Sequence, residues 1–149
     1  MNTDKELLCS EKQALTATAV STDSIYMAGL VGASRARNLR CVAQVETSLT
    51  GGTATGITVE IIQADNAALT TNVVSLGSTG VVANGASNVN VAAGSRLLDV
   101  PLPPVSQPYL GFRYTMATGP YAAGVITAGI VIGTETPFQQ RPLHNSHGF

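Results

Sequence analysis

Charged residues are scarce in this chain. Lys, Arg, Asp and Glu make up 11% of its 149 residues, and the formal net charge is −1, whereas an average soluble domain is about 25% charged. A basic face that would attract nucleic acid or an anionic membrane is therefore missing. We expect neither nucleic acid nor membrane as a partner.

Residues that carry catalysis or anchor ligands are also few. The chain has no Trp, 5% aromatic residues and only two histidines, His144 and His147. Nucleophilic catalysis needs an oriented base beside the nucleophile, and no histidine precedes position 144 to serve as one. We therefore predict no enzymatic activity, no cofactor and no catalytic, cofactor-binding or metal-binding residues.

Long apolar runs are missing too. The best candidate, residues 122–132, is shorter than the roughly 18 residues that a membrane-spanning helix needs. The polar N-terminal residues have no apolar segment of a secretion signal behind them. These features predict a protein made in the cytoplasm.

Alternating apolar and polar residues are the strongest structural signal that is present. In residues 39–46 and 57–63 every second residue is apolar, which is the pattern of strands with one buried face. A Gly-rich loop, residues 51–56, separates the two segments and favours an antiparallel pair of neighbours. Further strands are expected at residues 20–28, 69–76, 97–100, 109–116 and 123–132.

This strand pattern predicts an all-β fold: an antiparallel sandwich that is jelly-roll-like and has extended N- and C-terminal arms. An up-and-down barrel is the alternative. We expect an arm at residues 1–19, a β-sandwich domain at 20–136 and a tail at 137–149. The two arms lack the alternation of the central strands, so they are expected to contact neighbouring chains.

Apolar residues outside the alternating strands are the candidate interface. They are Leu7 and Leu8 in the arm, Leu102, Pro103, Pro104 and Tyr109 in a proline-rich segment, and Phe138, Leu143 and Phe149 in the tail. A lone monomer rarely leaves such a surface open, so we expect a homodimer or homotrimer.

Three patterns could be mistaken for sites. His144 and His147 have the spacing of metal ligands but no third ligand nearby, and exposed or interface histidines explain them better. Glu46 and Glu60 would have to approach each other to act on a sugar, but two solvated strand carboxylates are the simpler interpretation. Cys9 and Cys41 are expected to be reduced thiols, although a bridge between them stays open.

Several segments together resemble a known family. They are Ser10–Ile25, Leu39–Glu46 and Ile57–Gln63 in the first half, and Arg96–Pro104, Tyr109–Tyr114 and Gly119–Ile130 in the second. The combination resembles the capsid cement (decoration) proteins of tailed bacteriophages, of the type first described in a Bordetella podovirus. The resemblance extends from about Leu8 to Gly133.

The resemblance implies a jelly-roll-like domain on the outside of a phage head. Such a protein would bind the major capsid protein, associate with itself and stabilise the shell without catalysis. A β-sandwich binding module, of a tail fibre or for carbohydrate, is the alternative and would present aromatic residues on one face. An enzyme of the cupin type would need His and Glu ligands spread over the strands, and this chain lacks those histidines.

Overall fold

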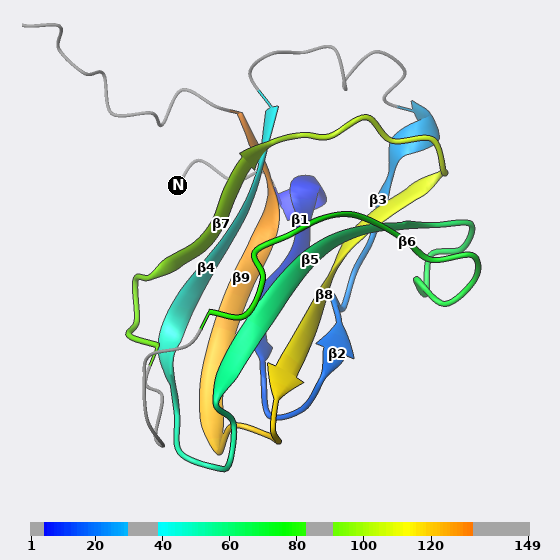
Figure 1. The fold of residues 1–149 in the computed structure, drawn as a ribbon. Helices are drawn as coiled ribbons and strands as arrows, with labels where there is room; N and C mark the ends of the chain where they lie inside the picture. The colour runs from blue at the N-terminus through cyan, green and yellow to red at the C-terminus, as the bar shows by residue number, and fades with distance from the viewer. Residues whose placement is uncertain (1–4, 30–38, 83–90, 133–149) are drawn as a thin grey trace, which may run out of the picture.

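The computed structural model describes residues 5–29, 39–82 and 91–132, and these form two antiparallel sheets packed face to face (Figure 1). One sheet has the order β1 (Leu8–Ala14), β9 (Ala123–Ile132), β4 (Leu39–Thr50) and β7 (Arg96–Pro101). The other has the order β2 (Ala19–Val20), β8 (Tyr109–Ala117), β5 (Gly56–Ala64) and β6 (Val74–Ser78), and β3 (Ile25–Tyr26) also pairs with β8. Two short 3-10 turns, Lys5–Leu7 and Met27–Gly29, flank β1 and β3.

The connections define a jelly roll. Only β2–β3 and β5–β6 are consecutive strands within one sheet, and every other connection between consecutive described strands crosses to the opposite sheet. With β2 and β3 taken as one interrupted strand, eight strands form two four-stranded layers, as in a double-sheet jelly roll. The prediction of an all-β antiparallel sandwich is confirmed.

The inward faces of the central strands make the core. In β4 the alternate residues Cys41, Ala43 and Val45 are fully buried, as the sequence pattern predicts. The expected inward residues of β5 are buried as well: Ile57, Val59 and Ile61. Beside β5 in the same sheet, β8 contributes its own alternate set to the same cluster: Leu110, Phe112, Tyr114 and Met116.

The expected pairing of the strands at 39–46 and 57–63 is wrong. β4 pairs with β7 and β9, whereas β5 pairs with β6 and β8 in the other sheet. The Gly-rich segment between them therefore runs from one sheet to the other and does not close a hairpin. Alternation shows which side of a strand faces the core, but it does not show which strand lies beside it.

The expectation that residues 1–19 form an arm is also wrong for the residues the structure describes there. β1 pairs with β9, and both Cys9 and Leu15 are fully buried, so the sandwich begins at Leu8. Two register shifts interrupt this ladder, which is why the segment shows no regular alternation. The tail at 137–149 lies outside the described residues.

The loop between β5 and β6 covers the outer face of the second sheet. Strand β6 begins only at Val74, later than the strand expected at 69–76, and Leu69 lies in the loop with a φ of 56°. Leu69 is buried against Ile62 and Ala64 in a small second cluster. Gly111 leaves room for it, because a Cβ at that position would overlap the Leu69 side chain.

A prediction follows from the close approach of β1 to β9. A Cβ at Gly129 would collide with the carbonyl oxygen of Leu7 and lie 2.9 Å from the Cα of Leu8. Gly129→Ala should therefore displace β1 and lower the free energy of unfolding by about 1–3 kcal/mol, measured by urea denaturation. Gly77→Ala in β6 is the control, because nothing lies within 4 Å of its Cβ position; equal losses in both variants would contradict the tight packing of β1.

Candidate interaction site at the open edge of the sandwich

One side of the sandwich is closed by hydrogen bonds between the two sheets, and the opposite side is open. On one side, hydrogen bonds join β1 to the segment of β2 and β3: Asp23 N donates to Cys9 O at 2.8 Å, and Gln13 Nε2 donates to Val20 O at 2.9 Å. Across the core, Ser10 Oγ and Tyr114 Oη lie 2.7 Å apart in a buried hydrogen bond. On the opposite side, β6 and β7 are the last strands of their sheets and do not pair with each other.

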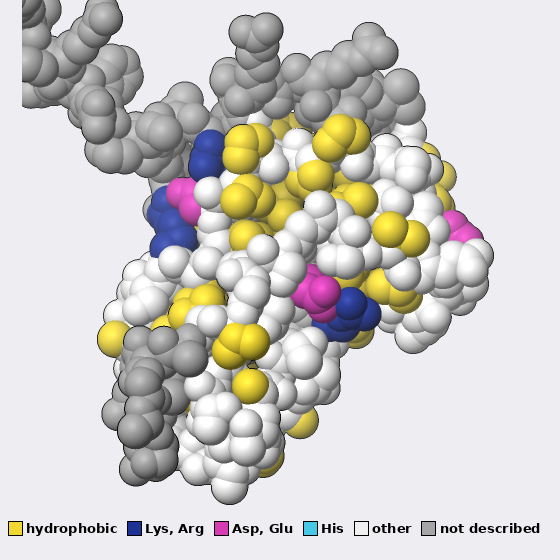
Figure 2. All heavy atoms as spheres, in the orientation of Figure 1, with side chains coloured by type: hydrophobic (Ala, Val, Ile, Leu, Met, Phe, Trp, Pro, Cys, Tyr) yellow, Lys and Arg dark blue, Asp and Glu magenta, His cyan; other side chains and the backbone are white. Residues whose placement is uncertain are grey.

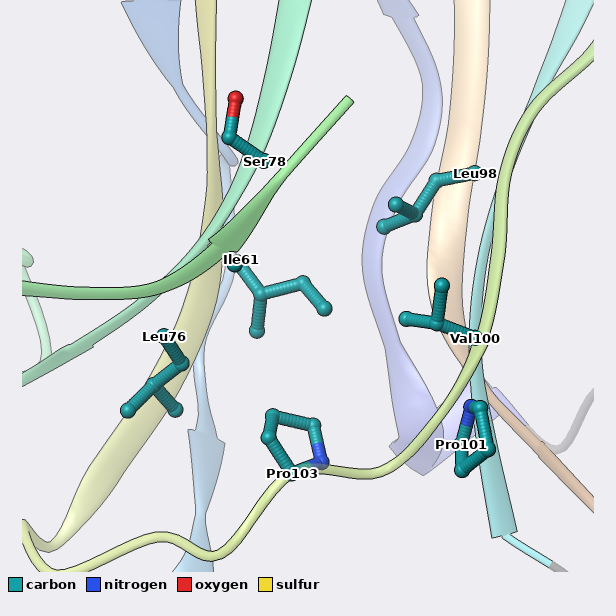
Figure 3. A pocket seen from close by; sticks show the side chains of 8 residues that line it. Ile61, Leu76, Ser78, Leu98, Val100, Pro101 and Pro103 are labelled. Carbon is teal, nitrogen blue, oxygen red and sulfur yellow. The ribbon is translucent and has the colours of Figure 1, made fainter. Parts of the chain in front are cut away.

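An apolar groove of about 280 Å³ lies between β6 and β7. Its walls are Ile61 of β5, Leu76, Gly77 and Ser78 of β6, Leu98, Val100 and Pro101 of β7, and Pro103. Ile61 and Leu98 extend toward each other from opposite sheets, with Ser78 near one end and Pro103 near the other (Figure 3). Hydrophobic side chains gather on the surface of this face between β7 and β6 (Figure 2). The site can therefore receive an apolar group, and the Ser78 hydroxyl is the one polar side-chain group in its lining.

The predicted interface residues of the proline-rich segment lie in different environments. Pro103 lines the groove and Pro104 is exposed. Leu102 is only 8% exposed, and its backbone N–H donates to Leu39 O at 2.9 Å, so its assignment as an outer contact is wrong. The prolines end the hydrogen-bonded pairing of β7 with β4. Because the alternation of buried and exposed residues ends there too, the sequence pattern does not indicate whether the side chain of Leu102 faces the core.

The predicted residues of the two arms are only partly described. Leu7 is half-buried and packs against the main core, and Leu8 is half-buried in β1. The described environment of Leu7 is therefore its own domain. Phe138, Leu143 and Phe149 lie outside the described residues.

A second apolar surface lies on the outer face of the five-stranded sheet. Tyr26 is 56% exposed, and its ring centroid lies 5.3 Å from that of the half-buried Tyr109. The register places the two residues opposite each other in β3 and β8. We call these two residues the Tyr26–Tyr109 patch. Tyr109 is among the residues predicted from the sequence, whereas Tyr26 was missed, because it belongs to a two-residue strand too short to show a pattern.

The carboxylates near the groove are neutralised by arginines. Arg113 Nε lies 2.5 Å from Glu60 Oε2, and this hydrogen bond holds the pKa of the Glu60 carboxyl below its usual value. Arg40 and Arg96 bind Asp99 at 2.5 and 2.9 Å. Burial raises the pKa of Asp99, but the hydrogen bonds from both arginines outweigh it and lower that pKa.

In the described part of the chain, the carboxylate pair considered from the sequence is not formed and no metal-ligand cluster is found. Glu46 and Glu60 belong to different sheets and do not form a pair that could flank a sugar bond. Among residues 5–29, 39–82 and 91–132, no three His, Cys, Asp or Glu side chains cluster to hold a metal ion. His144 and His147 lie outside these ranges.

The two cysteines are buried thiols that are not joined by a disulfide. Burial raises the pKa of both, that of Cys41 to about 12, so neither is a reactive thiolate at neutral pH. No helix in the described segments is long and apolar enough to cross a membrane.

The comparisons with known proteins place this jelly roll among phage proteins. The family model of Bbp16, a Bordetella phage protein family, matches residues 9–130. The chain therefore belongs to the Bbp16 family. The matched range begins in β1 and ends in β9, so it covers both sheets of the sandwich. No curated protein matches the chain.

The Glu60–Arg113 pair leads to a pH-dependent prediction. Because the folded-state pKa of Glu60 is lowered, its stabilisation is present above the pKa of the unfolded chain, about 4.3, and is lost as pH falls through the lower folded-state pKa. Glu60→Gln should cost less than about 1 kcal/mol at neutral pH, since the pair is partly exposed to solvent.

Urea denaturation at neutral pH and at a pH below that folded-state pKa tests this expectation. The difference between Glu60→Gln and the unmodified protein should disappear at the lower pH. Glu46→Gln is the matched control, because Glu46 is exposed on β4 and belongs to none of the ion pairs found among the described residues. A difference that stays constant with pH would show that the charge of Glu60 is not what stabilises the fold.

Proposed function

We propose that this chain is a capsid cement protein. It would bind the outside of a bacteriophage head and stabilise the shell of the major capsid protein, without catalysis. The proposal includes association with itself as a homodimer or homotrimer. The observation that carries it is the membership in the Bbp16 family of phage proteins, together with the resemblance of the same segments to capsid cement proteins.

The chemistry of the described residues supports a role in packing. The charges near the groove are used in local ion pairs, and the remaining distinctive surfaces are apolar. An exposed tyrosine pair can bury apolar surface against a shell subunit, and burial of apolar surface is the main favourable term in protein association. On a symmetric shell, an oligomer can also engage several subunits, which increases avidity beyond that of one contact.

The Tyr26–Tyr109 patch is our candidate for the shell contact. Tyrosine is enriched among residues that dominate binding energy, because it combines a large apolar ring with a polar hydroxyl. Tyr26 is the most exposed aromatic residue in the described segments. It already packs against Tyr109, so little side-chain entropy would be lost when a partner covers it.

A carbohydrate-binding sandwich remains the second candidate because of the same patch. Such a module presents aromatic rings on one face, and Tyr26 with Tyr109 supplies a small surface of this kind. In a cement protein a shell subunit would cover the patch, whereas in a carbohydrate-binding module a sugar would cover it. Binding to phage heads and binding to a glycan array therefore distinguish them.

A particle-binding experiment tests the proposal. Heads of the phage that encodes this chain, prepared without the protein, are mixed with purified protein and sedimented. We expect the protein to sediment with the heads and to raise the temperature at which they disrupt. Heads that stay free of protein at saturating concentration would contradict the proposal, and specific glycan binding would then favour the second candidate.

The patch has its own variant in the same assay. Tyr26→Ala should weaken head binding about tenfold, or about 1.4 kcal/mol, while leaving the melting temperature of the free protein nearly unchanged, since the side chain is largely exposed. Val81→Ala is the matched control, because Val81 is 61% exposed and follows β6 near the opposite end of β5. Equal binding by Tyr26→Ala and Val81→Ala would remove the patch from the contact.

A further inference from the structure

We propose that the C-terminal segment of the same chain, residues 134–149, occupies the groove between β6 and β7, with Phe138 as its first apolar anchor. The inference goes beyond the proposed function, because it concerns what covers the open edge of the free protein. It can fail while head binding holds, and the reverse is also possible.

Strand β9 ends close to the groove. Ile132 lies opposite Leu39 in the β9–β4 ladder, and Leu39 O accepts the hydrogen bond from Leu102 N. Ile132, Leu39 and Leu102 therefore occupy one row across the sheet, and Figure 1 shows the end of β9, the start of β4 and the end of β7 together at one end of the sandwich. Pro101 and Pro103, on either side of Leu102, line the groove.

The distance to be spanned is short. Two strand spacings separate the end of β9 from Leu102, which is about 10 Å. The six residues from position 133 to Phe138 reach up to about 20 Å when extended. Phe138 is the first large apolar residue after Ile132, so it is the first side chain of the segment that can fill the groove.

The lining of the groove suits such an anchor. The lining side chains other than Ser78 are aliphatic or proline, and Gly77 adds no side chain. Leu98 and Ile61 belong to the main core and are 5% and 1% exposed, so the base of the groove is already formed by packed side chains. An aromatic ring that lies across it would remove the apolar walls from water.

The chain's own tail is favoured over the tail of a second copy, because its effective concentration at the groove is higher. A short tether presents its anchor to its own groove at an effective concentration in the millimolar range. A tail from another copy would match this only at comparable protein concentrations. The tether therefore favours the intramolecular arrangement.

Paramagnetic relaxation in the full-length protein tests the inference. Gln139→Cys introduces one reactive thiol next to Phe138, and Cys9 and Cys41 are fully buried, so a nitroxide label attaches at position 139. In methyl-labelled protein, the signals of Leu76, Leu98 and Val100 should be lost through broadening, and should return when the nitroxide is reduced. The methyl signals of Val125, near the opposite end of β9, provide the internal reference.

Two controls decide the outcome. Adding Phe138→Ala to the spin-labelled chain should restore the groove signals, and a mixture of spin-labelled chain with separate methyl-labelled chain should show no broadening. Groove signals that stay sharp in the spin-labelled protein, or that broaden equally with Phe138→Ala, would overturn the proposal. Broadening in the mixture would also overturn it, because the occupant would then be the tail of a second copy.

Discussion

The rest of the structure depends on which of the four edge strands are joined to each other and which are left unpaired. A sandwich of two open sheets exposes unpaired backbone groups at each of its edges, and exposed edges attract other chains. Here one pair of edges is closed, because β1 and the β2–β3 segment exchange hydrogen bonds through Cys9, Gln13, Val20 and Asp23. The other pair, β6 and β7, is held apart, and the groove lies between them. These hydrogen bonds join the two sheets on the closed side, whereas apolar side chains line the groove on the open side.

The low charge of the chain has a structural counterpart. Glu60 is paired with Arg113, and Asp99 is shared by Arg40 and Arg96, so the carboxylates near the open edge act as local bridges between strands. The described surface feature that remains for recognition is the Tyr26–Tyr109 patch, because we propose that the chain's own C-terminal segment fills the groove. Recognition of a partner through this surface would depend on shape and buried apolar area. This agrees with membership in a phage protein family and with the structural role proposed above.

Polar residues inside the sandwich give its closed side a specific geometry. Ser10 is fully buried, bonds to Tyr114 across the two sheets and donates to Gln13 Oε1 at 2.6 Å. Gln13 in turn donates to Val20 O. A buried polar group without a partner costs free energy, so this chain of bonds favours one register of β1 over shifted alternatives. The register shifts of β1 against β9 are compatible with these bonds.

The class of fold and the inward faces of the main strands could be predicted from the amino-acid sequence. The alternation in β4 and β5 identified Cys41, Val45 and Val59 as core residues, because a side-chain period of two follows from the pleat of any strand. The combined resemblance of many separate segments indicated a phage protein. Of the candidate site, the sequence identified Pro103 and Tyr109, since prolines and aromatic residues stand out by type alone.

Tertiary contacts, in contrast, set which strands are neighbours and which apolar residues stay exposed. They place β4 and β5 in different sheets, take β1 into the sandwich, bury Leu102 and leave Tyr26 at the surface. They also place β6 and β7 as facing edges, although residues 79–95 separate these strands in the sequence. Pairing and burial depend on contacts between residues far apart in the chain. A local pattern can orient a side chain, but it cannot show which distant segment will cover it.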